Sequence, residues 1–244
     1  MKYLLTLLFI LLAMPVYANG LLDSDQDGVP DKDEIEIYKT DPNKKDTDND
    51  GYSDWLELNY GYSPHNQGNV KLEENDYDGD GLSDRMELNF RTDLSNPDTD
   101  GDGYQDGDEI NYYYDPLNIE KVKLAKRIEI NTSAQILSYF LGGIRMEKFL
   151  VSTGKPSMPT PKGHFVVDGK ALRAWSHWGL WMPYWMSLQN GYFGIHELPE
   201  WPGGMKEGED HLGKPVSHGC IRLGVGPAEF LYNWADLGTP VFIY

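Results

Sequence analysis

The sequence predicts a mainly β domain with one or two short helices, preceded by an acidic module of repeated loops with short helical turns. Three observations support this fold class. Residues 23–118 carry 28 acidic and 7 basic side chains, a net charge of −21, whereas the rest of the chain carries +3. An acidic pattern of twelve residues recurs four times within the acidic stretch. After residue 122, short β-branched or aromatic runs alternate with turn residues, which is typical of antiparallel strands.

Residues 1–18 are predicted to form a secretory signal peptide. Lys2 precedes an apolar run from Leu4 to Met14, and Pro15 and the small residue Ala18 follow it. The run is too short to span a bilayer comfortably and no stop-transfer charges follow it, which disfavours a membrane anchor. No later segment is long and apolar enough to span. We therefore expect no membrane span in the mature protein and a periplasmic or secreted location.

The four repeats read DSDQDGVPDKDE, DTDNDGYSDWLE, DYDGDGLSDRME and DTDGDGYQDGDE. Each has acidic residues at positions 1, 3, 5, 9 and 12 and glycine at position 6, which is the ligand spacing of a calcium loop. A disordered acidic linker would not keep this register four times. The sequence therefore predicts structural Ca²⁺ sites. The predicted ligands are Asp23, Asp25, Asp27, Asp31 and Glu34; Asp46, Asp48, Asp50, Asp54 and Glu57; Asp76, Asp78, Asp80, Asp84 and Glu87; and Asp98, Asp100, Asp102, Asp106 and Glu109.

The spacing between the loops distinguishes them from EF-hands, which need a helix before the loop as well as after it. Here there is room for little more than the turn that leaves each loop. Ile35, Leu58, Leu88 and Ile110 each follow the last glutamate of a loop, and they predict that the loops pack on one another. The region resembles bacterial thrombospondin type 3 repeats. That resemblance implies a calcium-stabilised spacer, or an interaction module with a protein or cell-wall partner.

The second half contains five predicted strands and one predicted helix. The strands are the runs KRIEIN (126–131), AQILSYFL (134–141), IRMEKFLVSTG (144–154), residues 164–167 and TPVFIY (239–244). The segment between Gly226 and Gly238 has the pattern of a short amphipathic helix, with Phe230, Leu231 and Trp234 on its buried side.

Four tryptophans lie close together in the run RAWSHWGLWMPYWMSL: Trp175, Trp178, Trp181 and Trp185. Their spacing is near-helical, but a glycine and a proline within the run argue against a continuous helix. They either pack in and around the core or form the wall of a substrate cleft.

Cys220 is the single cysteine of a chain that we expect to be exported. It cannot form an internal disulfide, so it is a functional thiol, an intermolecular partner or a small buried side chain. A nucleophilic thiol needs a nearby base. The candidate bases in the same domain are His164, His177, His196, His211 and His218.

Several phrases in the second half occur in the order seen in one family. They are VSTGKPSMPTPKGHFVV (151–167), GIH ending at His196, SHGCIRL (217–223) and the terminal GTPVFIY. Together they resemble the L,D-transpeptidase catalytic domain of the YkuD type, from about Lys123 to Tyr244. The resemblance implies an L,D-transpeptidase-like β-sandwich. We divide the chain into a signal peptide (1–18), a repeat module (19–118) and a catalytic domain (119–244).

The resemblance also implies the roles of the site residues, which are Cys220, His196, His218, Gly219, Arg222 and Ser217. Cys220 would be the nucleophile and His196 the base, oriented by the backbone carbonyl of Glu197. The amides of Gly219 and Cys220, with that of His218 as a further candidate, would hold the oxyanion. Arg222 would support the site geometry or bind a substrate carboxylate.

This family implies attack on a peptidoglycan stem peptide, release of D-alanine and cross-linking to a neighbouring stem, without a catalytic cofactor. Hydrolysis by the same fold and a non-catalytic, calcium-dependent wall-binding protein remain alternatives. The segment 197–216 is longer than is usual in the family, which leaves the acyl acceptor open and makes His211, inside it, a rival base. Nucleic acid is not expected as a partner, because the acidic half would repel phosphates and the other half lacks a basic patch.

Overall fold

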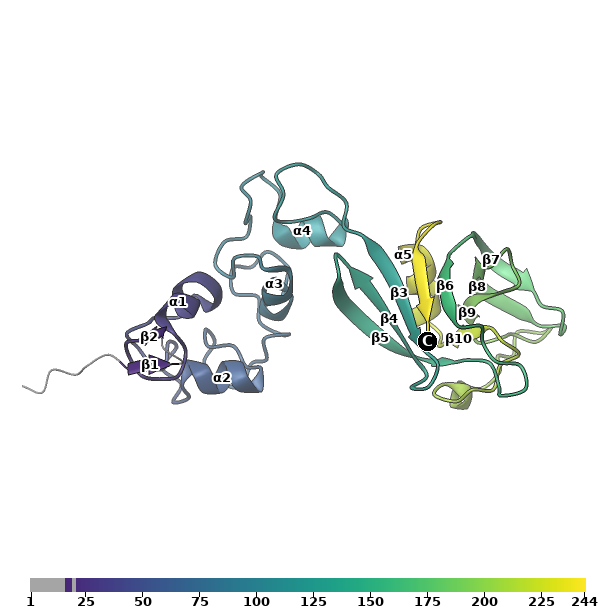
Figure 1. Cartoon of the computed structure of the whole chain (residues 1–244), viewed down its shortest axis with the longest axis horizontal. Coiled ribbons are helices and arrows are strands. Elements are labelled where there is room, and N and C mark those ends of the chain that lie inside the picture. The colour runs from purple at the N-terminus through teal and green to yellow at the C-terminus, as the bar shows by residue number, and fades with distance from the viewer. Residues whose placement is uncertain (1–15, 19–20) are drawn as a thin grey trace, which may run out of the picture. The chain divides into compact units, whose positions relative to one another are not determined.

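The computed structural model describes residues 16–18 and 21–244 and divides the chain into two compact units (Figure 1). The first unit extends to Val122, and the second comprises Lys123–Tyr244. Most of the predicted signal peptide, residues 1–15, lies outside the described residues, as do residues 19–20. The amide of Asp115 donates to the carbonyl of Val122 at 3.0 Å, which ties the end of the first unit together. In the part of the chain that is described, no helix is long and apolar enough to cross a membrane.

Each acidic loop of the first unit leads into a short helix, which confirms the predicted helical turns (Figure 1). A two-stranded sheet of β1 (Val16–Ala18) and β2 (Leu21–Asp23) precedes the first loop. The helices are α1 (Asp31–Asp33) with its π-helical continuation η1 (Glu34–Tyr38), α2 (Asp54–Tyr60), α3 (Asp84–Phe90) and α4 (Asp106–Asn111). The position-6 glycine has a φ between 91° and 112° in all four loops, a conformation that few other residues adopt.

The loops pack on one another in pairs. Asp27, at position 5 of the first loop, accepts a hydrogen bond of 3.0 Å from the amide of Trp55, at position 10 of the second loop. Asp80 and Gly107 make the equivalent bond of 2.8 Å between the third and fourth loops. These contacts link the first loop to the second and the third to the fourth.

The predicted apolar anchors of this packing were wrong in part. Ile110 is buried, but the side chain of Ile35 is 57% exposed. The buried aliphatic residues of the loops lie instead at position 7 of the first and third loops, which are Val29 and Leu82. Leu58 and Leu88 are half-buried. The sequence pattern does not show which of the four positions another part of the fold covers.

Replacing Gly107 with alanine should destabilise the first unit. A Cβ atom at this position would lie 2.6 Å from the carbonyl oxygen of Asp80 and 3.0 Å from the amide nitrogen of Leu82. Both atoms belong to the backbone and cannot rotate away, so we expect a loss of about 1–3 kcal/mol. Thermal unfolding at saturating Ca²⁺ would measure it. Asp108→Ala, an exposed change in the same helix, should cost less than about 0.5 kcal/mol; equal losses for the two variants would contradict the prediction.

The second unit is built on one sheet of nine strands, in the order β6-β11-β3-β4-β5-β10-β9-β8-β7. The pairs β11·β3 and β10·β9 are parallel and the other pairs are antiparallel. The strands are β3 (Lys126–Asn131), β4 (Ile136–Leu141), β5 (Ile144–Ser152), β6 (Gly163–Val166), β7 (Gly169–Trp175), β8 (Trp181–Leu188), β9 (Phe193–Glu197), β10 (Ile221–Leu223) and β11 (Pro240–Ile243).

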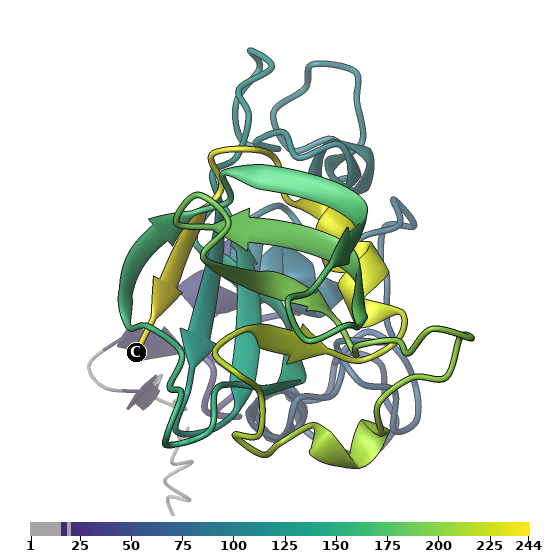
Figure 2. The ribbon, with the colours of Figure 1, turned by 90° about the vertical axis from the view of Figure 1, so that its right-hand side faces the viewer.

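The sheet curls so that its two parts face each other. In Figure 2, β7 and β8 (green) run across the direction of β3 (teal) and β11 (yellow). Phe165 on β6 meets Phe193 on β9 edge to face, with ring centroids 5.1 Å apart, although five strands separate β6 from β9 in the sheet. The mainly β prediction is confirmed, because a nine-stranded sheet forms the framework of this unit.

Helix α5 (Pro227–Trp234) packs on the sheet, and η2 (Glu209–His211) is a single 3₁₀ turn. Leu231 and Trp234 are buried as predicted. Phe230 was predicted to be buried, but its side chain is 43% exposed. Its ring contacts those of Tyr139 and Phe149, with centroid distances of 5.2 Å and 6.3 Å, and these contacts cover it only in part.

Candidate active site and cation-binding loops

The register of β9 and β10 brings the cysteine and histidine segments together. Cys220 directly precedes β10, in which Ile221 and Leu223 are fully buried. Because side chains alternate along a strand, Cys220 and Arg222 point to the opposite face. Arg222 pairs with His196 in the parallel register of β10 and β9. The imidazole of His196 is thus brought close to the thiol and the guanidinium, although it lies more than twenty residues upstream of them in the sequence.

These groups line a cavity of about 430 Å³. Five of the six residues that the resemblance assigns to the site contribute to its lining: Cys220, His196, His218, Arg222 and Ser217. Gly219 and the rival base His211 are not among the described residues that line it. The cavity therefore brings together the thiol and the base that the resemblance implies, and the assignment of catalytic roles stays a prediction.

His196 is buried, with its side-chain orientation set by one hydrogen bond. Its Nδ1 lies 2.5 Å from the backbone carbonyl oxygen of Glu197. A carbonyl only accepts, so Nδ1 carries the proton and Nε2 is the basic nitrogen of the neutral ring. Burial, with a smaller contribution from the charge of Arg222, lowers the pKa of His196 to about 3. The imidazole is therefore neutral at physiological pH.

The thiol of Cys220 is partly exposed and is not ionised at rest. Burial raises the pKa of Cys220, and this outweighs the opposing effects of a hydrogen bond from the Gly194 backbone and of the Arg222 charge. A neutral thiol beside a neutral imidazole is suited to general-base catalysis, in which His196 takes the proton as the sulfur attacks.

This resting state predicts the pH dependence of alkylation. A raised pKa leaves less thiolate at neutral pH than a free cysteine has, and the thiolate is the reactive form. We expect iodoacetamide to modify Cys220 slowly at pH 7, with the midpoint of the rate profile above about 8.5, the ordinary value for cysteine. Mass spectrometry of the intact protein reports this site alone, because the chain has one cysteine. A midpoint below about 7 would instead show a thiolate–imidazolium pair.

The turn that presents Cys220 is held by hydrogen bonds within its own motif. Gly219 has a φ of +115°, which favours glycine at this position. The buried hydroxyl of Ser217 donates to the Cys220 carbonyl at 2.6 Å and accepts from the Gly219 amide at 3.1 Å. The Gly219 amide, one of those assigned to the oxyanion, is thus engaged by Ser217 in this structure. Its role in binding an oxyanion stays a prediction.

Thr160 supports this turn, a role that sequence reasoning missed. Its hydroxyl donates to the carbonyl of Gly219 at 2.9 Å and accepts from the amide of Gly154 at 2.8 Å. A Cβ on Gly154 would lie 2.2 Å from the carbonyl oxygen of Met158, so only glycine fits there. Both residues belong to the phrase VSTGKPSMPT, which carried the resemblance but had no role assigned. The phrase holds the turn around Gly219 in place.

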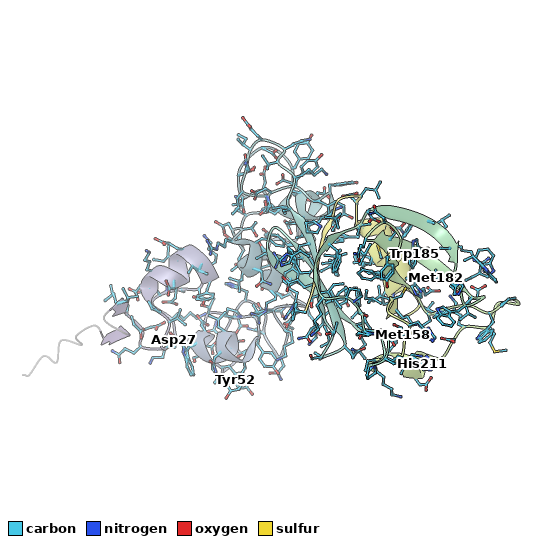
Figure 3. All side chains as sticks on the ribbon, turned by 45° about the vertical axis from the view of Figure 1, so that its right-hand side comes forward. Asp27, Tyr52, Met158, Met182, Trp185 and His211 are labelled. Atoms are coloured by element: carbon cyan, nitrogen blue, oxygen red, sulfur yellow. The ribbon has the colours of Figure 1, made fainter. Side chains whose placement is uncertain are left out.

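Tryptophans form one wall of the cavity, which favours the second of the two interpretations given above. Trp175, Trp178 and Trp185 line the cavity, and Trp181 packs edge to face on Trp175 at 4.8 Å. Figure 3 labels Trp185 and Met182 in the second unit, and both line the cavity. Trp178 stacks on the ring of His218, with centroids 4.3 Å apart. His218 thus belongs to the wall as well as to the turn that presents Cys220.

In the first unit, the aspartates at positions 1, 3 and 5 of every loop converge. One carboxylate oxygen from each lies within 4.8 Å of the others in the group. Asp27 in Figure 3 belongs to the first such group. The groups are Asp23, Asp25 and Asp27; Asp46, Asp48 and Asp50; Asp76, Asp78 and Asp80; and Asp98, Asp100 and Asp102. Hard oxygen ligands in this arrangement fit a cation such as Ca²⁺.

A periodic set of buried carboxylate oxygens supports that fit. At positions 3 and 12 of every loop, one oxygen is buried without a hydrogen-bond partner among the described residues: Asp25 and Glu34, Asp48 and Glu57, Asp78 and Glu87, and Asp100 and Glu109. Buried acceptors normally have partners, and eight orphans at two repeated positions indicate a shared missing partner. Burial followed by neighbouring carboxylates raises the pKa of Glu57 and Glu87 to about 8. A bound cation would relieve both the desolvation and the repulsion.

The position-9 aspartates are placed differently. Asp54 accepts from the amide of Thr47 at 2.8 Å and from its hydroxyl at 2.7 Å. Asp31 and Asp106 make the same two bonds to Ser24 and Thr99. Asp84 accepts from the amide of Tyr77 and from two other side chains. These carboxylates close the loops, and their role as metal ligands stays a prediction.

The fold and the cleft make the second unit a β-rich domain with a cysteine and a histidine in one cavity. Residues 125–243, nearly all of this unit, match the family model of the L,D-transpeptidase catalytic domain, YkuD. Residues 23–45, 46–61, 76–93 and 98–118 match the bacterial TSP3 repeat. Both resemblances drawn from the sequence are therefore confirmed.

Curated relatives carry the same family name. The chain is 27% identical over 97 residues to the putative L,D-transpeptidase YkuD of Bacillus licheniformis, which covers 40% of this chain and 52% of the relative. It is 28% identical over 96 residues to the putative L,D-transpeptidase YkuD of Bacillus subtilis, and this match covers 39% of this chain and 52% of the relative. A solved L,D-transpeptidase from Stackebrandtia nassauensis is 27% identical and covers 50% of this chain and 57% of that one, with a TM-score of 0.42. The match spans about half the length of the curated relatives.

Proposed function

We propose that this protein is an exported L,D-transpeptidase that acts on peptidoglycan stem peptides through an acyl-enzyme at Cys220. The observation that carries the proposal is the neutral imidazole of His196, oriented by the Glu197 carbonyl, in one cavity with the only thiol of the chain. Export is part of the proposal because peptidoglycan lies outside the cytoplasm and residues 1–18 have the pattern of a signal peptide.

The chemistry follows from the two neutral groups. Nε2 of His196 takes the thiol proton while the sulfur of Cys220 attacks the carbonyl carbon of the L,D peptide bond. Backbone amides of the turn around Gly219 stabilise the oxyanion. The imidazolium then gives its proton to the leaving amine, so D-alanine departs and a thioester remains. An amine of a neighbouring stem attacks the thioester, which forms the new amide bond and restores the thiol.

The first unit is proposed to bind Ca²⁺ and to act as a spacer or interaction module for a protein or cell-wall partner. The carboxylates at positions 1, 3, 5 and 12 of each loop would hold the ion, together with the backbone carbonyl at position 7. The ion would supply the positive charge that the buried carboxylates lack. The TSP3 match and the convergent aspartates support this proposal.

Purified protein incubated with tetrapeptide muropeptides tests the enzymatic proposal by mass spectrometry. Dimers with loss of D-alanine would show transfer to an amine. Shortened monomers would show transfer to water, which is the activity of an L,D-carboxypeptidase. Cys220→Ala is the matched control. No change with the wild type would overturn both enzymatic functions and favour a non-catalytic, calcium-dependent wall-binding role.

A further inference from the structure

The segment between β9 and β10 forms a short hairpin that borders the catalytic cavity. Trp181 and Glu200 exchange two backbone hydrogen bonds of 2.9 Å, and Glu200 also bridges Lys206. The turn closes with a bond of 2.8 Å from the Trp201 amide to the Met205 carbonyl. Ion pairs from Arg173 to Glu200 and from Lys206 to Glu197 tie the hairpin to the sheet. These hydrogen bonds and ion pairs therefore fix the hairpin, residues 199–207, to the rest of the second unit.

This hairpin brings a carboxylate into the cavity. Glu207, its last residue, lines the cavity together with Cys220 and Arg222. Its Oε2 lies 2.8 Å from Nη1 of Arg222, a residue that is only 6% exposed. The Nε of Arg222 is buried without a hydrogen-bond partner in the described chain, so the guanidinium keeps a donor that no protein group uses. Glu207 thus supplies, from the chain itself, the carboxylate that pairs with Arg222 beside the thiol.

The position of Arg222 brings its guanidinium within reach of the carboxyl-terminal end of the donor peptide. Cys220 and Arg222 point to the same face of the strand, with Cα atoms about 6.6 Å apart. The carboxylate of the leaving residue lies about one residue, or 3.8 Å, from the bond that the thiol attacks. A free carboxylate there can reach the guanidinium. It would meet the charge of Glu207 at the same cation, and two carboxylates that share one site repel each other.

We propose that Glu207 is a specificity-determining residue of the donor site. It occupies Arg222 and weakens the binding of donor peptides that have a free carboxylate on the leaving residue. This inference rests on the proposed function, because it assigns a subsite of the same cleft. Donors in which that carboxylate is absent or amidated are bound without the repulsion.

Two tetrapeptide donors that differ only at the terminus, the free acid and the amide of D-alanine, test the proposal. The wild type should have the lower KM for the amide. Glu207→Gln removes the charge but keeps an oxygen that can accept from Arg222, and it should lower the KM for the free acid about tenfold. The KM for the amide should change less than about twofold. The proposal would be overturned if Glu207→Gln changed the KM for both donors equally, or if it raised the KM for the free acid.

A matched variant separates specificity from a structural effect of the hairpin. Glu200→Gln breaks the ion pair with Arg173 in the same hairpin, outside the described lining of the cavity. It should leave the ratio of the two KM values at the wild-type level. A loosened hairpin would change the ratio in both variants, which would contradict a specific role for Glu207.

Binding measurements distinguish this proposal from the proposed function. Calorimetric titration of Cys220→Ala with the same two peptides requires no turnover. Adding Glu207→Gln to that variant should tighten binding of the free acid about tenfold and leave the amide unchanged. If the wild type forms no product but this shift is seen, the enzymatic proposal fails and the role of Glu207 stands. If the shift is absent, the role of Glu207 fails whatever the activity. If Glu207→Gln does not fold, the KM values of the wild type for the two donors test the proposal. A wild-type KM that is lower for the free acid than for the amide would overturn it.

Discussion

Cys220→Ala should abolish product formation from muropeptides, and His196→Ala should lower kcat/KM about 10²–10⁴-fold. The first change removes the only thiol of the chain. The second removes the proposed base, whose Nε2 carries no proton because Nδ1 donates to the Glu197 carbonyl. Without that base, the raised pKa of Cys220 leaves little thiolate to attack at neutral pH. Product formation followed by mass spectrometry, with initial rates at several donor concentrations, measures both effects.

Two other histidines provide controls for this prediction. His164 is exposed on β6, outside the described lining of the cavity, and His164→Ala should change kcat/KM less than about threefold. His211 was the rival base in the sequence, and it does not line the cavity in the described part of the chain. If His211→Ala abolished turnover while His196→Ala retained it, the assignment of the base would be wrong.

Removal of divalent cations should unfold the first unit and leave the second intact. Eight buried carboxylate oxygens have no hydrogen-bond partner within the described part of the chain, and each such group costs about 1–3 kcal/mol when it is unsatisfied. Their sum is comparable to or larger than the 5–15 kcal/mol by which domains are usually stable. The carboxylates also repel one another, so folding and cation binding should be coupled.

Limited proteolysis and circular dichroism with excess chelator measure this effect. We expect cleavage within residues 23–118, loss of helical signal and recovery of both with Ca²⁺. Mg²⁺ should restore less, because its smaller octahedral shell suits these loops poorly. The alkylation profile of Cys220 is the internal control and should not change. Retained helical signal and protease resistance in excess chelator would show that the loops fold without a cation.

The features that the sequence predicted well depend on residues close together in the chain. The twelve-residue spacing alone predicted converging carboxylates, and the position-6 glycines predicted the turn, because both arise within one loop. The short β-branched and aromatic runs of β3, β4 and β5 and the apolar stripe of α5 were recognised for the same reason. Ile35 and Phe230 mark the limit, since both are exposed where apolar spacing predicted burial. Local periodicity shows which side chains share a face but not whether another element covers that face.

Only the tertiary structure decided which residues of the candidate site lie next to one another. The sequence by itself determined the identity of the repeats, the lone thiol and the motif around Cys220, and the resemblance pointed to His196. The parallel register of β9 and β10 placed the imidazole beside Arg222, and the inserted hairpin placed Glu207 on that cation. The twelve-residue patterns could be predicted from the sequence because each lies within one loop. The shared cavity could not, because strand register and hairpin docking depend on contacts between residues far apart in the chain.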